Sequence, residues 1–348
     1  MKWILWTTFF LLLSFNSFAE QKEVYPSPII QLDDYFTHHV LIAEKSTHTL
    51  YLFENNQGIP KLVKSFAMVS GKKAGDKLFQ GDYRTPEGVY EFTQFLTHED
   101  LIKKHGKQGE IYGVGAFVMN FPNPLDRRQR KTGGGIWLHS TNDETRIEKG
   151  LDSRGCLVSA NDHLIEISKY IELHKTKVIV VHNLTWMNKS TWDNRRAQLN
   201  KTIEDWRASW ENENFKKYIS HYHSAEFNDN KRGNVSEFGT YKRAVFNNPG
   251  KPVVEFLNTS ILAADNYVLV SLLQNYQSNT INDKGRKIIY LKKDQFYDYK
   301  IVHESWNKDG IENFEDDEQK MAFKPTLRFF KTMNSNQILH ITGKKENN

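Results

Sequence analysis

The chain has a single cysteine, Cys156, which follows Ser153-Arg154-Gly155, and His139 ends a short apolar stretch upstream of it. A thiol with an imidazole beside it in space is the minimal machinery for acyl transfer through a thioester. A lone cysteine is also compatible with a small, inert side chain in a hydrophobic core. The choice between the two depends on what surrounds the thiol.

Local features favour a nucleophile. Gly155 lets the backbone approach closely, and a Gly-Cys turn before a helix can direct amide donors at a developing oxyanion. Arg154 favours the thiolate over the thiol. At the reference pKa near 8.5, only about 3% of a thiol is ionised at pH 7, so a histidine that accepts the proton is needed. His139 and Cys156 both stand at strand or loop termini, where catalytic side chains commonly lie.

The elements that must position this pair are mostly strands. Short runs of alternating or apolar residues between 38 and 183 are bounded by turn residues, a pattern that predicts strands. Asn161 has the character of a helix N-cap, and apolar residues follow it at helical spacing. Residues 38–183 are therefore predicted to form a mainly β domain with a helix near its end.

The pattern changes after Asn183. Residues 190–220 have a helical composition, with tryptophans along one apolar face that we expect to lie in a core. Strand-like runs follow over 253–256, 266–275, 286–299 and 337–342. A helical lead followed by strands predicts a second, α+β domain over 193–348, joined to the first by a linker at 184–192.

The N-terminus indicates export. Lys2 precedes an apolar run, and Ser17-Phe18-Ala19 has small residues at the positions of a cleavage site, so we expect a signal peptide over 1–19. A short polar segment, 20–37, follows it. No later stretch is apolar enough for a membrane span. The 47 basic residues are nearly matched by 42 acidic ones, which gives no support to nucleic-acid binding.

The spacing of His139, Ser153-Arg154-Gly155-Cys156 and Asn161 resembles the signature of the L,D-transpeptidase (YkuD) catalytic domain. There, a histidine lies a short distance before Ser/Thr-x-Gly-Cys, and an asparagine follows the cysteine. Thr85-Pro86-Glu87-Gly88 is similar to the family's Thr-Pro-x-Gly segment. The resemblance covers roughly 38–183. It implies a β-sandwich or flattened barrel with the Cys-His site under a mobile flap, for which 97–134 is the candidate.

The resemblance also implies a mechanism that needs no metal and no cofactor. Cys156 attacks the carbonyl between the L-centre of meso-diaminopimelate and the terminal D-Ala of a peptidoglycan tetrapeptide stem, and His139 takes the thiol proton. The backbone carbonyl of Ser140 orients the imidazole, and the amides of Gly155 and Cys156 hold the oxyanion. Residues around the pair are predicted to contact the substrate, namely Trp137, Ser153, Arg154 and Asn161.

Some positions depart from the family pattern. Ser140 stands where many members carry Gly, and Arg154 where His is common. Val158 stands where the family often has an Arg, whose positive charge in the pocket serves amine-accepting members. Both fates of the acyl-enzyme therefore stay open: release by an amine, which forms a cross-link, or by water, which trims the stem.

The second domain resembles an NTF2-like cone, a curved sheet wrapped by helices. The two domains in this order are similar to L,D-carboxypeptidases that trim tetrapeptides to tripeptides and set cell shape in curved bacteria. This favours water as the acceptor. The expected signal peptide predicts a periplasmic location, and the family resemblance implies peptidoglycan stem peptides as partners and, as a family-level expectation, a homodimer. A non-catalytic wall-binding scaffold is the alternative from another class.

Other motifs have structural interpretations. His221-x-His223 lacks a third metal ligand at a suitable spacing, and Gly113-Val114-Gly115 lacks the last glycine of a dinucleotide-binding fingerprint. The basic run 127–131 is expected to be a solvated loop, with the gripping of substrate carboxylates or anionic glycan as its alternative. Thr85-Pro86-Glu87-Gly88 is expected to be structural, because Pro fixes φ and Gly relieves the backbone.

Overall fold

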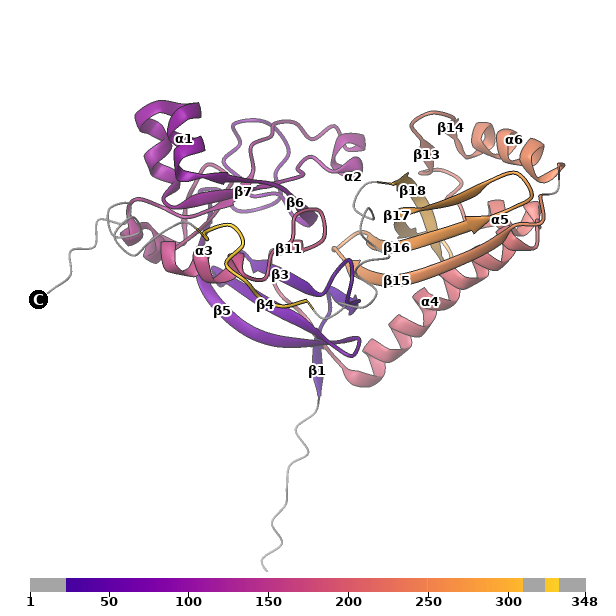
Figure 1. Cartoon of the computed structure of the whole chain (residues 1–348), viewed down its shortest axis with the longest axis horizontal. Coiled ribbons are helices and arrows are strands. Elements are labelled where there is room, and N and C mark those ends of the chain that lie inside the picture. The colour runs from indigo at the N-terminus through magenta and orange to yellow at the C-terminus, as the bar shows by residue number, and fades with distance from the viewer. Residues whose placement is uncertain (1–22, 249, 309–322, 332–348) are drawn as a thin grey trace, which may run out of the picture.

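The computed structural model describes residues 23–248, 250–308 and 323–331. Two domains lie side by side, and the long helix α4 runs along the second (Figure 1). The expected signal peptide, 1–19, and the expected strand at 337–342 lie outside the described residues. Within the described residues, no helix is both long enough and apolar enough to cross a membrane.

The first domain is a closed barrel. Its strands pair in the order β10-β8-β7-β6-β11-β3-β4-β5, and β10 also pairs with β5, which closes the ring; β9 pairs with β5 outside it. The strands are β3 (His39–Glu44), β4 (Thr49–Asn56), β5 (Ile59–Gly71), β6 (Gly88–Thr97), β7 (Gly115–Met119), β8 (Trp137–His139), β9 (Leu151–Ser153), β10 (Leu157–Ser159) and β11 (Lys177–Val181).

The helices of this domain lie between barrel strands. They are α1 (His98–His105), the 3-10 helix η1 (Gly106–Tyr112), α2 (Pro124–Arg128), the 3-10 helix η2 (Glu144–Lys149) and α3 (Asn161–Ser168). The N-cap of α3 is Ala160, which makes no side-chain capping bond, so the prediction that Asn161 caps this helix was wrong. Asn161 is the first helical residue, and its side chain enters a buried network instead.

Alternation along β3 shows why its sequence is apolar throughout. Leu41 and Ala43 lie in the barrel core, whereas Val40 and Ile42 share a second cluster with residues of the other domain. Successive side chains of a strand point to opposite faces, so a strand buried on both faces needs a continuous apolar run. The second domain therefore covers one flank of the barrel with a shared core.

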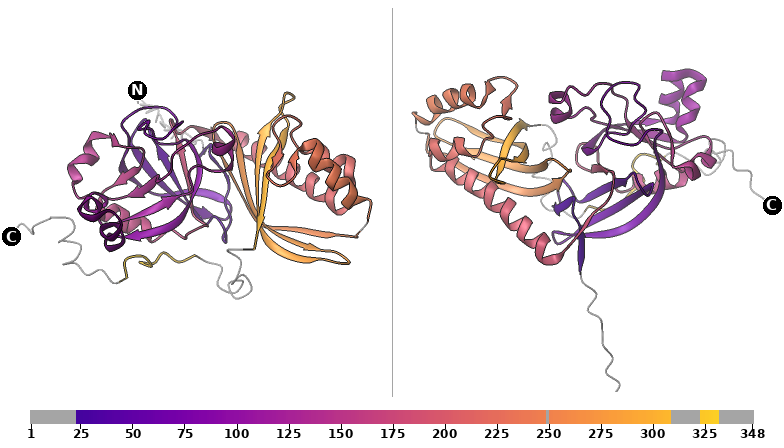
Figure 2. Two further views of the ribbon diagram at one scale, coloured as in Figure 1. Left: turned by 90° about the horizontal axis from the view of Figure 1, so that it is seen from above. Right: turned by 180° about the vertical axis from the view of Figure 1, so that it is seen from behind.

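The second domain is an antiparallel sheet in the order β18-β17-β16-β15-β2. Two further views show this sheet standing beside the barrel, with the helices on its far face (Figure 2). Its strands are β2 (Ile29–Gln31), β15 (Val253–Ala263), β16 (Val268–Gln277), β17 (Asn282–Lys293) and β18 (Tyr299–Asn307), and its helices are α4 (Lys189–Glu211), α5 (Phe215–Ser220) and α6 (Val235–Phe246). Two short ribbons complete the elements: β1 (Val24–Pro26) with β12 (Trp186–Asn188), and β13 (Asn228–Asp229) with β14 (Gly233–Asn234).

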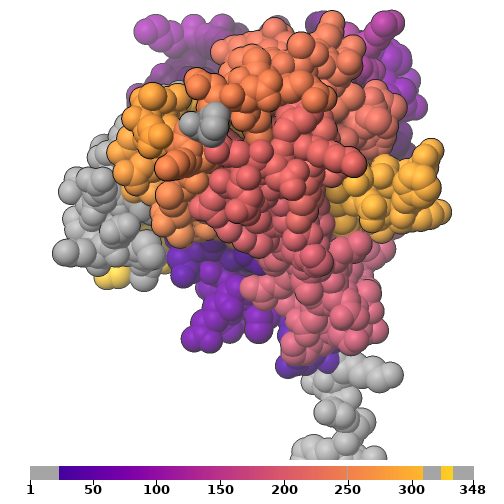
Figure 3. Space-filling model, turned by 90° about the vertical axis from the view of Figure 1, so that its right-hand side faces the viewer, coloured from indigo at the N-terminus to yellow at the C-terminus, as the bar shows by residue number. Residues whose placement is uncertain are grey.

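One face of α4 packs on the sheet, as its apolar spacing predicts. Trp192, Leu199, Ile203 and Trp206 are all buried. Seen from the side of the second domain, this helix and its neighbours hide most of the barrel (Figure 3). The predicted strand 286–299 is two strands, β17 and β18, because residues 294–298 form a turn in which Tyr297 has a φ of 64°. The predicted classes, a mainly β domain and an α+β domain, are confirmed.

Three segments differ from their predicted roles. Ile29–Gln31 forms the edge strand β2 of the second sheet, and Ile29 and Ile30 are fully buried, so 20–37 is not a separate polar lead. The predicted linker at 184–192 contains β12 and the start of α4. Residues 323–331, predicted to belong to the second domain, return to the barrel (Figure 1, yellow), where Phe330 enters the core. Such returns depend on contacts between distant residues, which local patterns do not encode.

Candidate active site

β8 and β10 bring His139 and Cys156 onto one face of the barrel. The strands run parallel, with Leu157 opposite Leu138 and Val158 opposite His139. Cys156 and His139 are therefore separated by one strand spacing and two residues along the strands, which is roughly 8 Å between their Cα atoms. Alternate residues of a strand share a face. The side chains of a cysteine and a histidine that point towards each other are long enough to meet across this distance.

The imidazole of His139 is held in one orientation. Its Nδ1 lies 2.5 Å from the carbonyl oxygen of Ser140. Because a carbonyl only accepts, Nδ1 carries the hydrogen, and in the neutral ring the lone pair belongs to Nε2. The contact predicted for the Ser140 carbonyl is therefore present, and it leaves Nε2 as the nitrogen that can accept a proton.

Tyr112, at the end of η1, covers the pair. Its ring meets that of His139 edge-on with 4.9 Å between centroids, and it lies equally far from the ring of Trp137. Cys156 packs against the same apolar cluster. Trp137 is only 7% exposed, so most of this side chain is a wall of the site under α1 and η1. Its contact with substrate stays a prediction.

A buried polar network holds Tyr112 in place. The hydroxyl of Ser140 donates to the carbonyl of Tyr112 at 3.2 Å and accepts from the amide of Val114 at 2.8 Å. Gly113 has a φ of 59°, and a Cβ on it would lie 2.4 Å from both the Ser140 hydroxyl and Asn161 Oδ1. The serine that departs from the family pattern thus ties the cover to the strand that carries His139.

Asn161 belongs to the same network and is 1% exposed. Its Nδ2 donates to the carbonyl of Thr141 at 2.8 Å and to Glu144 at 3.1 Å, and its Oδ1 accepts from the amide of Val114 at 3.2 Å. These contacts use both donors of the side-chain amide and one of the two lone pairs of Oδ1. In this arrangement Asn161 supports the segment that follows His139. Its predicted contact with substrate would require these bonds to break.

The turn before Cys156 needs glycine. Gly155 has a φ of 127°, and a Cβ there would lie 2.7 Å from the carbonyl oxygen of Arg84. Ser153 staples the turn, because its hydroxyl donates to the carbonyl of Cys156 at 2.6 Å and accepts from the amide of Gly155 at 3.0 Å. The predicted oxyanion amide of Gly155 is therefore engaged in the resting site. It becomes available only when the Ser153 hydroxyl turns away.

The predicted flap, 97–134, is not a single unit. α1 and η1 lie over the site, but residues 115–119 form the barrel strand β7 and α2 faces the second domain. The chain then returns to the site, where the thiol of Cys156 donates to the carbonyl of Gly135 at 3.5 Å. Arg154, predicted to contact substrate, is exposed beside the site.

Both groups of the candidate pair are neutral at pH 7. Burial raises the pKa of the Cys156 thiol to about 11, opposed by a backbone hydrogen bond with Trp137 and by the cations of Lys77 and Arg146. Burial lowers the pKa of His139 to about 4, against the hydrogen bond to Ser140, which raises it. About one thiol in ten thousand is then ionised at pH 7. A thiolate at this position therefore requires a base that takes the proton.

Arg146 is a part of this electrostatic environment that the sequence motifs do not mark. Its cation lowers the pKa of both Cys156 and His139. The guanidinium is held by Asp152, 2.8 Å from its Nε, and by the hydroxyl of Thr141 at 3.2 Å from Nη1. Val158 is fully buried in β10. Arg146 thus brings a positive charge to the pocket from η2. The only hint of this in the sequence is that Arg146 lies between His139 and Cys156 along the chain.

The prediction of a solvated loop for the basic run 127–131 agrees with Arg127, Gln129 and Arg130, which are exposed, but not with Arg128 and Lys131. Arg128 donates to the carbonyl of Val302 in the second domain at 2.6 Å. Lys131 is buried between Asp76, at 2.6 Å, and Asp126, at 2.9 Å. Both cations are engaged by groups of the protein. Within the described residues, no cluster of three or more His, Cys, Asp or Glu side chains is placed to hold a metal ion.

Comparisons with known proteins agree with this geometry. The sequence profile of the L,D-transpeptidase catalytic domain (YkuD) matches residues 38–180, and that of the Cds6 C-terminal NTF2-like domain matches residues 198–305. A search of curated proteins finds no match.

Two solved structures match most of the chain. Bd1075 from Bdellovibrio bacteriovorus is 30% identical, with 82% of this chain and 99% of that one covered and a TM-score of 0.71. The helical cell shape determining protein Pgp2 from Campylobacter jejuni is 23% identical, with 80% and 95% covered and a TM-score of 0.65, which shows a shared fold. The chain therefore belongs to the L,D-transpeptidase (YkuD) family of cell-wall enzymes, and it joins that catalytic domain to a C-terminal NTF2-like domain.

Proposed function

We propose that the protein is an L,D-carboxypeptidase that removes the terminal D-Ala from peptidoglycan tetrapeptide stems. The observation that carries this proposal is the neutral imidazole of His139, whose Nδ1 is committed to Ser140 and whose Nε2 is left to act on Cys156 from the neighbouring strand. General base catalysis on a thiol is the chemistry that such a pair supports.

In the first step, His139 Nε2 takes the thiol proton as Cys156 Sγ attacks the carbonyl carbon between the L-centre of meso-diaminopimelate and D-Ala. The oxyanion accepts from the Cys156 amide, and from Gly155 once the Ser153 hydroxyl has turned. Collapse of the tetrahedral intermediate breaks the C–N bond, and the imidazolium returns its proton to the leaving amine of D-Ala. The product is a thioester on Cys156.

In the second step, His139 takes a proton from water, and the resulting hydroxide attacks the thioester. The thiolate of Cys156 leaves and is protonated by His139, which regenerates the site and releases a tripeptide stem. An amine attacking in place of water would form a cross-link, which is the alternative, an L,D-transpeptidase that forms cross-links or attaches wall proteins.

Water is favoured as the acceptor on two grounds. Val158 is buried in β10 at the position where amine-accepting members of the family often carry an Arg, and Arg146, which supplies the positive charge of this pocket, is held by Asp152. The two domains in this order resemble L,D-carboxypeptidases, and the shared fold with Pgp2, which is named as a determinant of helical cell shape, favours a role in cell shape. Such a role requires action on the wall outside the cytoplasm, and so supports export by a signal peptide to the periplasm.

The proposal is tested by incubating the purified protein with tetrapeptide muropeptides. We expect release of D-Ala and formation of tripeptides, both abolished in Cys156→Ala, with Asp162→Ala, at an exposed position of α3, as the control. Addition of an amine acceptor distinguishes transfer from hydrolysis. Retained binding to sacculi without turnover in any condition would support a non-catalytic scaffold and would refute the proposal.

A further inference from the structure

Two loops flank the nucleophile. The β5–β6 loop (72–87) brings the carbonyl of Arg84 against Gly155, and the α2–β8 loop (129–136) presents the carbonyl of Gly135 to the thiol. The loops are also joined to each other. The amide of Thr132 donates to Leu78 O at 3.1 Å, and the Thr132 hydroxyl accepts from the amide of Gln80 at 3.2 Å. Their relative position therefore sets the surroundings of Cys156.

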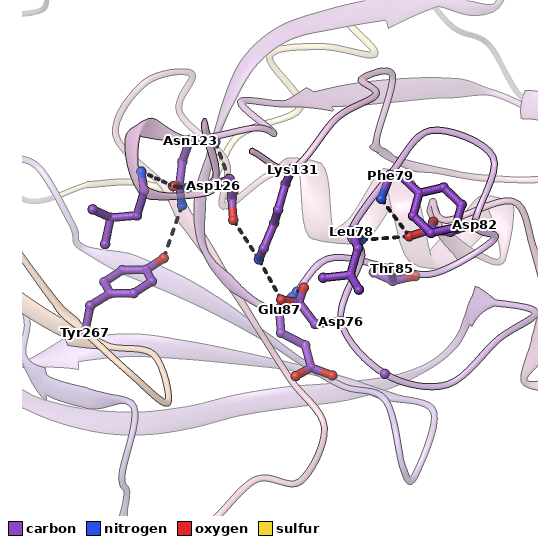
Figure 4. A network of polar contacts seen from close by, with 12 residues as sticks. Asp76, Leu78, Phe79, Asp82, Thr85, Glu87, Asn123, Asp126, Lys131 and Tyr267 are labelled. Atoms are coloured by element: carbon purple, nitrogen blue, oxygen red, sulfur yellow. Dashed lines mark hydrogen bonds and ion pairs between the residues drawn. The ribbon is translucent and has the colours of Figure 1, made fainter. Parts of the chain in front are cut away.

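The roots of both loops meet at one buried ammonium group. Lys131 Nζ lies 2.6 Å from Asp76 on the β5–β6 side and 2.9 Å from Asp126 on α2. The other oxygen of Asp76 accepts from the amide of Glu87 at 2.8 Å. Figure 4 shows Lys131 pointing between the two carboxylates. Separation of a buried ion pair leaves each charge uncompensated, which is strongly unfavourable. The pair therefore keeps Asp76 and Asp126 at a fixed distance from Lys131.

This network continues into the second domain. The amide of Asn123 donates to Asp126 at 3.0 Å, and the side chain of Asn123 caps α2. Its Nδ2 donates to the hydroxyl of Tyr267 at 3.2 Å (Figure 4). Tyr267 stands in the turn between β15 and β16, and its hydroxyl also accepts from the amide of Val89 at 2.7 Å.

The hydroxyl of Tyr267 lies against Gly88, where the absence of a side chain makes room for it. Gly88 has a φ of 150°, and a Cβ there would lie 2.9 Å from that hydroxyl. Gly88 ends the Thr85-Pro86-Glu87-Gly88 segment, which the sequence marks without showing a partner for it. The ring of Tyr267 is 7% exposed and packs beside Tyr290, with 5.5 Å between centroids. Tyr267 is therefore a buried side chain of the second domain seated at the root of the active-site loops.

We propose that Tyr267 is a positioning residue for the reaction, which it serves by holding Asn123 and, through Asp126, Lys131 and Asp76, the two loops that flank Cys156. The inference rests on the proposed function in one respect, because its kinetic test measures the release of D-Ala. Tyr267 touches neither the thiol nor the imidazole; it acts through the network. The NTF2-like domain is thus a structural part of the catalytic site.

Tyr267→Phe tests the proposal, because it removes the hydroxyl that accepts from the amide of Val89 and from Asn123 Nδ2. Both buried donors then lose their acceptor. Asn123→Ser keeps an N-cap for α2 but cannot reach Tyr267. We expect each variant to lower kcat for D-Ala release by about tenfold, the size of effect that loss of one buried acceptor produces, with KM within about twofold. The double variant should lose no more than either single one, since both cut the same path.

Tyr222→Phe is the matched control, because it removes a buried hydroxyl of the same domain that bonds Tyr218 at 2.6 Å, away from the path. The rate at which iodoacetamide alkylates Cys156 at pH 8 gives a second readout that needs no substrate. It should change in Tyr267→Phe and Asn123→Ser, because the two loops set the surroundings of the thiol, but not in Tyr222→Phe.

Lower unfolding free energy with unchanged kcat and alkylation would make Tyr267 merely structural and would overturn the proposal, as would strictly additive losses in the double variant. A changed alkylation rate in the path variants, in a protein that turns over no muropeptide, would keep the positioning role and reject the proposed reaction instead.

Discussion

Asn161→Ala separates support of the site from contact with substrate. The substitution removes an amide that donates to the Thr141 carbonyl and to Glu144 and accepts from Val114. Buried hydrogen bonds contribute about 1 kcal/mol each. Three such bonds give a loss of about 3 kcal/mol in the free energy of unfolding. The segment Ser140-Thr141, which orients His139, would loosen with it.

Urea unfolding followed by tryptophan fluorescence measures the first effect, and kcat and KM for D-Ala release measure the second. We expect lower stability and lower kcat with little change in KM. The neighbouring exposed variant Asp162→Ala, which disturbs only the first turn of α3, should lose less than about 1 kcal/mol and keep its activity. An Asn161→Ala protein of unchanged stability with a strongly raised KM would show that this side chain binds substrate and that our assignment is wrong.

Further predictions concern charge and packing. Because the pKa of His139 is lowered to about 4, kcat/KM should stay level from pH 8 down to pH 5 and fall as the imidazole is protonated near pH 4; half-maximal activity near pH 6.5 would contradict this. Because the pKa of Cys156 is raised to about 11, its alkylation rate should keep rising up to pH 10, whereas a plateau near pH 9 would indicate an ordinary thiol. Arg146→Gln should raise both pKa values, and so slow alkylation at pH 8 relative to the wild type; an equal or faster rate would remove Arg146 from the site. Phe330→Ala should lower the free energy of unfolding by about 3 kcal/mol, because it empties a buried position in the barrel core; an unchanged urea midpoint would show that the segment 323–331 does not stabilise the barrel.

The order of the two domains was predictable from the sequence, which also marked His139 and Cys156 as the candidate pair. His139 and Cys156 are marked by short motifs with regular spacing, and the fold class follows from strand alternation and the helical tryptophan face. These signals are local, since each is contained in a single element or turn. The same holds for Gly155, whose positive φ is a property of its own turn.

Residues that act through distant partners were not predictable in this way. Lys131 belongs to a basic run whose composition indicates a solvated loop, yet Asp76 and Asp126 bury it. Asn161 was expected to cap a helix and bind substrate, but its partners come from three other segments. Tyr267 carries no motif at all, because its role depends on how one domain docks on the other.

The thioester on Cys156 is the central claim, and mass spectrometry of protein quenched in acid during turnover tests it most directly. We predict an adduct of the tripeptide acyl group on the peptide that contains Cys156, absent from Cys156→Ala, which also releases no D-Ala. Release of D-Ala by Cys156→Ala at the rate of the unchanged protein would contradict the account.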